Sequence, residues 1–171
     1  AMCQLASGAI GIASAPSGAS TGAAEAHELR DGDPSRYRGL GCRRAVANIK
    51  GELAQSLVGR AFATQQEIDQ AMIALDGTPS KGRLGANAIL AVSLAFARAV
   101  AVERQQPLYH YFATLLDQPL RPQLPRPTIN LFSGGKHAGG QAPLQDVLVV
   151  ASAAQTIDDV MAMTVAVFQA A

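Results

Sequence analysis

The chain has 171 residues, of which 49% are hydrophobic and 16% charged, which is typical of a packed globular protein and excludes a disordered one. Its 14 basic and 13 acidic residues are interspersed and give a formal net charge of +1, so no nucleic-acid partner is predicted. Cys3 and Cys42 lie far apart without CxxC spacing, which favours free thiols in a reducing cytoplasm over a zinc site or a disulfide framework.

The start of the chain lacks the pattern of a secretory signal. No basic stretch precedes the first apolar residues, so a secretory signal is not predicted and a cytoplasmic location is expected. The sequence begins within an expected strand and stops within an expected helix that has no cap. We therefore expect that both ends are cut from a longer protein.

The first elements are two short strands, 2–5 and 9–15, joined by a turn of small residues. The first candidate loop, made of small hydroxyl and glycine residues, follows at 16–22. Composition leaves two interpretations open: a connector whose Ser or Thr caps a short helix at 23–29, or a lid that closes on an anion or a metal with hydroxyls and backbone amides.

A charged turn at 30–34 is expected to form a solvated face with local ion pairs. Two amphipathic helices are predicted next. The first covers 42–57, with Gly59 placed to end it, and the second covers 65–75, with Thr64 as its N-cap. We interpret both helices as structural support.

The segment from Leu84 to about Arg104 is predicted to be a long helix at the centre of the first domain, because it is apolar nearly all round. Polar residues interrupt it, at Asn87, Ser93 and Arg98, so a core helix is favoured over a membrane span. A further helix at 107–116 carries aromatic side chains that we expect to pack against this core: Tyr109, Tyr111 and Phe112.

Four prolines between 118 and 127 mark the best domain boundary. The sequence thus predicts a first domain at 1–118, a linker at 119–126 and a second domain at 127–171. The second domain is expected to hold strands at 127–132 and 144–151 and a helix at 157–170. These elements resemble the opening of a larger α/β unit, since they cannot close a barrel by themselves.

The stretch between those two strands is where chemistry is expected. Four glycines between 134 and 140 permit positive φ angles and close approach to a ligand. Lys136 and His137 lie between them, so a cation and a group that titrates near neutrality share one loop. Gln145 and Asp146 open the second strand and are expected on opposite faces of it. A solvated hairpin is the alternative, because such motifs often match by chance.

Several stretches, in this order and at similar spacing, resemble the enolase (phosphopyruvate hydratase) family over nearly the whole chain. They are P-S-G-A-S-T-G at 16–22, E-L-R-D-G-D at 28–33, L-D-G-T at 75–78, L-G-A-N-A-I-L at 84–90, P-L-Y at 107–109, and the glycine loop with its G-G-x-H-A core.

The resemblance implies an α+β N-terminal domain, a small antiparallel sheet of three strands carrying helices, followed by the first ββα elements of an incomplete TIM-like barrel. It implies magnesium-dependent dehydration of 2-phosphoglycerate to phosphoenolpyruvate, and a homodimer. Ser20 matches the serine that binds magnesium. Gly18 and Ala19 match substrate-binding positions beside it.

In the glycine loop, which is the second candidate loop, His137 matches the histidine near the substrate phosphate. The resemblance implies both a catalytic and a binding role for it. Gln145 matches a substrate-binding glutamine. Asp146 occupies the place of a catalytic and substrate-binding glutamate and is one methylene shorter. The shortening leaves a related phosphonate or another phosphoglycerate analogue open as the substrate.

The family's three metal carboxylates and its base lysine belong to later barrel strands. Beyond Arg104 the only acids are Asp117, Asp146, Asp158 and Asp159, so the 171 residues alone are expected to be inactive. Two hypotheses follow: part of an enolase-family enzyme, or a non-catalytic enolase-like scaffold that binds another protein.

Overall fold

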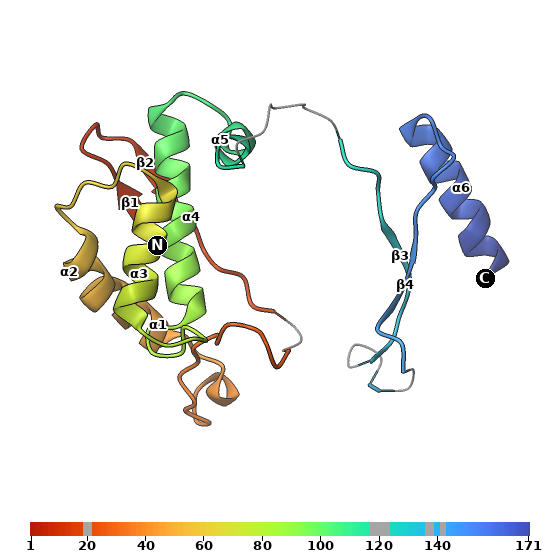
Figure 1. Cartoon of the computed structure of the whole chain (residues 1–171). Helices are drawn as coiled ribbons and strands as arrows, with labels where there is room; N and C mark the ends of the chain where they lie inside the picture. The colour runs from red at the N-terminus through yellow and green to blue at the C-terminus, as the bar shows by residue number, and fades with distance from the viewer. Residues whose placement is uncertain (19–21, 117–123, 136–138, 141–142) are drawn as a thin grey trace. The chain divides into compact units, whose positions relative to one another are not determined.

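The structure, a computed structural model, describes residues 1–18, 22–116, 124–135, 139–140 and 143–171. The chain divides into two compact units, Ala1–Leu120 and Arg121–Ala171, and each is described by itself (Figure 1). The expected linker at 119–126 lies largely outside the described residues. The division into 1–118, 119–126 and 127–171 therefore stays a prediction.

The first unit contains a two-stranded antiparallel sheet. Strands β1 (Met2–Gln4) and β2 (Ile10–Ile12) pair Met2 with Ile12 and Cys3 with Gly11. Backbone bonds between Ala1 and Ala13 extend the pairing by one residue. The second strand is thus shorter than the expected 9–15, and the described residues supply no third strand to this sheet.

Helix α4 (Ala86–Glu103) packs against both strands of this sheet and against α3 and α5 (Figure 1). Ala91, Ala95 and Ala99 are buried at intervals of one helical turn. A Cβ atom built on Gly11 would overlap the carbonyl oxygen of Ala95 and the backbone nitrogen of Ala99. Strand β2 therefore rests directly on the helix backbone, and the prediction of a central core helix is confirmed. By length and composition α4 would also pass as a membrane span, but in this unit it is the core helix.

The remaining helices of this unit, among the described residues, are the 3-10 turn η1 (Tyr37–Gly39), α1 (Arg43–Asn48), the π-helical η2 (Ile49–Leu53), α2 (Ala54–Leu57), α3 (Gln65–Asp76) and α5 (Leu108–Thr114). Of these, α1, η2, α3 and α5 pack against α4. The predicted helix at 42–57 is thus helical throughout but changes its winding in the middle. Thr64 caps α3 by accepting from the Glu67 amide, and Gly59 has φ 80 just beyond α2, as predicted.

Two polar groups lie inside this core. The Nε2 of Gln65 donates to Ser93 Oγ at 3.0 Å, and its Oε1 accepts from the Tyr111 hydroxyl at 3.2 Å, which joins α3, α4 and α5. Asp76 is 2% exposed and accepts bonds from Thr78 and from the Leu84 amide. Of the three aromatic residues expected to pack, Tyr111 is buried, whereas Tyr109 and Phe112 are exposed.

The predicted helix at 23–29 is wrong. After a turn at 23–25 the chain has no regular secondary structure, and the backbone groups of His27 and Leu29 bond to residues 80–87. The His27 amide donates to Ser80 O at 2.7 Å, and the Ala86 amide donates to His27 O at 2.8 Å. Tertiary hydrogen bonds thus override the local helical preference.

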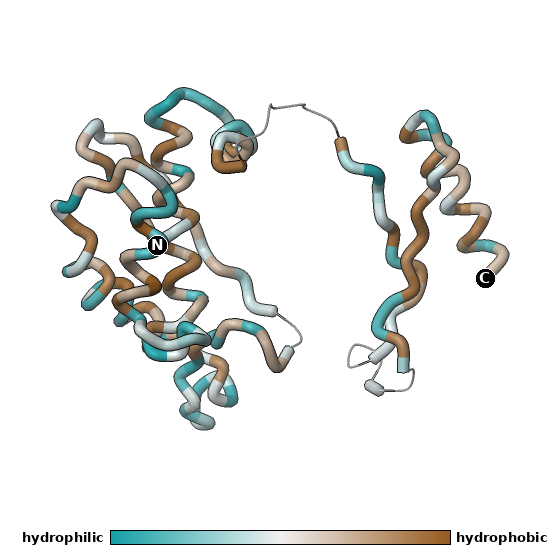
Figure 2. Tube along the Cα trace, viewed as in Figure 1, coloured by the Kyte–Doolittle hydropathy of each residue, from teal (hydrophilic) through white to brown (hydrophobic). Residues whose placement is uncertain are grey.

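The second unit is a hairpin followed by a helix. Strands β3 (Ile129–Ser133) and β4 (Asp146–Val149) pair in antiparallel fashion, with an irregularity between Asn130 and Phe132. Helix α6 (Ile157–Ala170) starts at a capping box between Thr156 and Asp159. Figure 2 shows hydrophobic segments along this hairpin, and Val147, Leu148 and Phe168 are exposed among the described residues.

Candidate functional site

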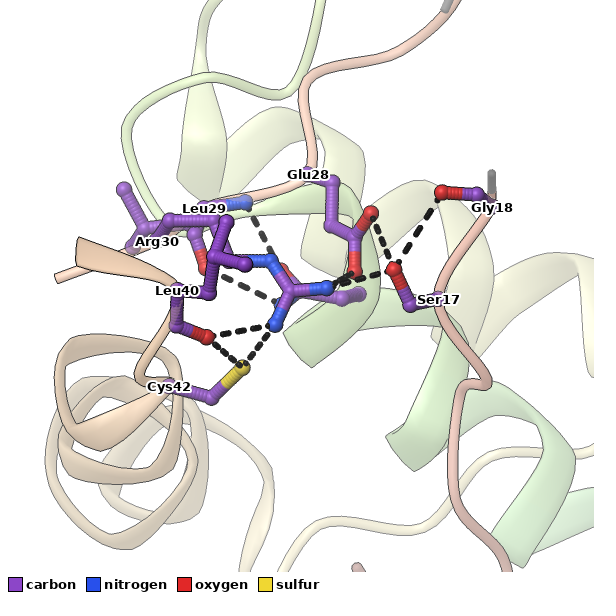
Figure 3. Close-up of polar contacts among 8 residues, drawn as sticks. Ser17, Gly18, Glu28, Leu29, Arg30, Leu40 and Cys42 are labelled. Atoms are coloured by element: carbon purple, nitrogen blue, oxygen red, sulfur yellow. Dashed lines mark hydrogen bonds and ion pairs between the residues drawn. The ribbon is translucent and has the colours of Figure 1, made fainter. Parts of the chain in front are cut away.

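The first candidate loop is described as far as Gly18 and again from Gly22. Pro16, Ser17 and Gly18 lie outside helices and strands and are exposed. The Ser17 hydroxyl lies 3.4 Å from Glu28 Oε2 and 3.3 Å from Gly18 O, so it connects the loop to the E-L-R-D stretch (Figure 3). Ala19 and Ser20 lie outside the described residues, and their predicted roles in substrate and magnesium binding stay predictions.

Arg30 is the centre of this cluster (Figure 3). Its Nη2 donates to Ser17 Oγ at 2.6 Å and forms an ion pair with Glu28. Its Nη1 donates to Leu40 O at 2.8 Å and to Cys42 Sγ at 2.9 Å. The turn at 30–34 is thus not simply a solvated face, because the first of its charged side chains is partly buried and holds four partners.

The backbone amide and carbonyl of Leu29 are both held by a side chain of α4. Asn87 donates from Nδ2 to Leu29 O and accepts at Oδ1 from the Leu29 amide, both at 3.1 Å. Gly85 has φ +97, and a Cβ at that position would lie 2.6 Å from Leu29 Cβ. Leu29 itself is buried, so Glu28 and Arg30 extend from an anchored segment.

The second candidate loop presents a carboxylate at the start of β4. Asp146 Oδ1 accepts from Asn130 Nδ2 at 2.9 Å and from Ser133 Oγ at 3.0 Å. Asn130 also donates to Ser133 Oγ at 2.7 Å. Asp146 is exposed and borders a shallow hollow of about 100 Å³ with Phe132, Ser133, Gly134, Leu144 and Val147. Two strands therefore orient one oxygen of this carboxylate.

Gln145 lies in a bend one residue before β4, so the strand begins at Asp146 and not at 144 as expected. Its carbonyl oxygen accepts from the Gly134 amide at 2.6 Å, which closes the base of the loop. His137 and Lys136 lie outside the described residues. The structure therefore places Gln145 and Asp146 at the base of the loop, and the roles of Gln145, Asp146 and His137 stay predictions.

No group of three metal-binding side chains occurs in the described part of the chain. The Mg²⁺ prediction depends on Ser20, outside that part, so no coordination geometry tests it. Gly18 and Asp146 belong to different units, and their predicted roles in substrate binding stay predictions.

Sequence reasoning missed Arg30, Asn130 and Ser133 as supporting residues of these loops. Ser133 could have been found from its pairing position opposite Asp146, and Asn130 from its place as a polar residue in the same strand. Arg30 carried a weaker signal, because a cation near a carboxylate in a turn is usually solvated.

Comparison with protein-family models gives two matches. The model described as "Enolase, N-terminal domain" matches residues 1–112, and the model "Enolase, C-terminal TIM barrel domain" matches residues 121–171. The predicted fold class, an α+β N-terminal domain followed by the first ββα elements of the barrel domain, is confirmed. The first match alone covers more than half of the sequence, and the chain belongs to the enolase family.

Proposed function

We propose that this chain forms part of a magnesium-dependent lyase that dehydrates 2-phosphoglycerate to phosphoenolpyruvate in glycolysis. The family match supports the reaction class. The observation that carries the assignment to residues is the orientation of Asp146 by Asn130 and Ser133. A carboxyl group held at one oxygen presents the other in a defined direction, as proton transfer to a leaving hydroxyl requires.

In this proposal Asp146 in its acid form donates a proton to the departing hydroxyl, which leaves as water. Gln145 and His137 bind the carboxylate and phosphate ends of the substrate, and Gly18 and Ala19 contact it from the first loop. Ser20 would hold a magnesium ion. Bound magnesium would stabilise the negative charge that develops when the proton next to the carboxylate is removed.

A second candidate is the corresponding reaction on a phosphonate or another phosphoglycerate analogue. Asp146 favours it, because its carboxyl group reaches one methylene less far than a glutamate would. A displacement of about 1 Å at a reacting group costs on the order of 100-fold in rate. A substrate whose hydroxyl lies closer to β4 would remove that cost.

We also propose a cytoplasmic homodimer. The outer face of the first sheet exposes Met2, Ile10 and Ile12, an apolar surface of the kind that a second copy covers. Both cysteines are free thiols, as the cytoplasm favours. Sedimentation of the protein, with Ile12→Glu as the test variant and the exposed Val58→Glu as a control, would measure this association.

The test of the reaction uses the complete protein that carries this chain. Product formation from 2-phosphoglycerate is followed by enolate absorbance, with magnesium and with a chelator. Magnesium-dependent turnover supports the proposal. Turnover only of a phosphonate analogue supports the second candidate. Calorimetry that detects neither magnesium nor phosphoglycerate binding, in a stable protein, supports the scaffold hypothesis and overturns both reactions.

A further inference from the structure

We infer that Arg30 is a positioning residue that fixes Ser17 and Gly18, and that it thereby sets the affinity of the first loop for its ligand. The inference rests on the proposed function, in which Gly18 contacts substrate. It is carried by the four contacts of the guanidinium group, which come from three separate stretches of chain (Figure 3).

The two terminal nitrogens of Arg30 contact different parts of the chain. Nη1 faces Leu40 O and Cys42 Sγ, the side of the cluster that leads into α1. Nη2 faces Ser17 Oγ and Glu28, the side that leads into the loop. Only a planar, forked cation can hold both sides at once, and a lysine ammonium is a single point charge. Arg30 thus ties an exposed loop to the folded core.

The segment that carries Arg30 is held firmly by the core. Leu29 is 4% exposed and is held on both backbone groups by Asn87, a residue of the first turn of α4. The Arg30 carbonyl also lies 3.5 Å from Arg44 Nη1. Pro16 and Ser17, in contrast, are exposed. Removal of the guanidinium group should therefore loosen the loop side and leave the core side intact.

The first test measures backbone ¹⁵N NMR order parameters in the 171-residue chain with Arg30→Met, Arg30→Lys and Arg43→Met. Arg43 is the matched control, because it is exposed, lies close by in sequence and forms no ion pair among the described residues. The order parameters of Ser17 and Gly18 should fall in Arg30→Met, from near the rigid value of about 0.85 towards about 0.6, less in Arg30→Lys, and not in Arg43→Met. High order parameters in α4 report whether each variant is folded.

The second test is kinetic and uses the complete protein. Arg30→Met should raise the half-saturating concentrations of substrate and magnesium about tenfold and change kcat less, because the loop must be ordered on binding. Unchanged order parameters at Ser17 and Gly18 overturn the inference. A fall in these order parameters without any change in half-saturation also overturns it, since Arg30 would then be only structural. Absence of turnover in the wild-type protein counts against the proposed function alone, because the NMR test needs no ligand.

Discussion

The side-chain amide of Asn130 lies 2.9 Å from Oδ1 of Asp146, across the hairpin that joins β3 to β4. Ser133 supplies a second donor to the same oxygen at 3.0 Å. The carboxylate is therefore oriented by its own hairpin before any ligand binds. Such support from neighbouring side chains is what a reacting group needs in order to be held in one direction.

Asp146→Asn should abolish most of the activity of the complete protein without unfolding it. The amide cannot donate a proton as an acid does, so kcat should fall by about 10²–10⁴-fold. Asp146 is exposed, and the melting temperature should change little. Ser133→Ala is the matched control, because it removes one donor and keeps the acid, and should cost less. Equal kcat values for Asp146→Asn and wild type would contradict the proposed role.

Gly11→Ala should destabilise the first unit strongly. The added methyl group would overlap the backbone of α4 at Ala95 and Ala99, and neither atom belongs to a flexible side chain. Overpacking of this kind costs about 1–3 kcal/mol and sometimes more. Urea unfolding followed by circular dichroism measures it.

Gly51→Ala is the control for that experiment. Gly51 lies inside the helical segment, and a Cβ there would meet nothing within 4 Å. Alanine should raise the free energy of unfolding by up to about 1 kcal/mol, because it is the better helix former. A loss of stability similar to that of Gly11→Ala would show that the close approach of β2 to α4 is not the cause.

Asp76 should make the first unit sensitive to acid. Burial raises the pKa of this carboxyl, but hydrogen bonds from Thr78 and Leu84 outweigh the burial and leave the pKa below its ordinary value of 3.8. The folded state thus favours the charged form. The stabilisation is fully present above that ordinary value and is lost as the pH falls through the lower folded-state pKa.

Unfolding curves between pH 7 and pH 3 would test this dependence. Asp76→Asn should be less stable than wild type at pH 7 by about 1–3 kcal/mol, and the gap should narrow towards pH 3. Glu52 and Asp159 also have lowered pKa values, through bonds from Arg83 and Thr156, so some acid sensitivity should persist in the variant. Parallel curves at all pH values would contradict the prediction.

Tyr111→Phe should destabilise the junction of α3, α4 and α5. The hydroxyl is the donor to Gln65 Oε1, and its loss leaves a buried acceptor without this bond. The expected cost is about 1–3 kcal/mol. Tyr109→Phe should be nearly neutral, because Tyr109 is 57% exposed. Thermal unfolding of the two variants side by side would distinguish them, and equal melting temperatures would refute the proposed contribution of the Gln65 bond.

Helices were predictable where a cap or a periodic apolar pattern marks them. Thr64 begins α3 and Gly59 follows the end of α2, as expected. Helix α4 was predicted from its long apolar sequence. The error at 23–29 arose because the partners of that segment are residues 80–87, far away in sequence. Periodicity reports local preference and contains no information on such distant hydrogen bonds.

The residue types of the candidate site were predicted from the sequence and stay predictions, whereas the side chains that support them were not predicted. Asp146 and Gln145 stood out because a polar pair followed a glycine loop. Arg30 did not, because its value depends on contacts with Ser17, Leu40 and Cys42 that only the folded chain creates. The roles of Ser20 and His137 rest on the family resemblance.

The closeness of β2 to α4 has a consequence for how changes in this protein are judged. A mutational survey that ranks positions by the side-chain surface they bury would give residue 11 no weight at all, since glycine has no side chain. The geometry makes this residue one of the least replaceable in the first unit. What determines tolerance there is the empty space that a larger residue would need, and the fold does not provide it.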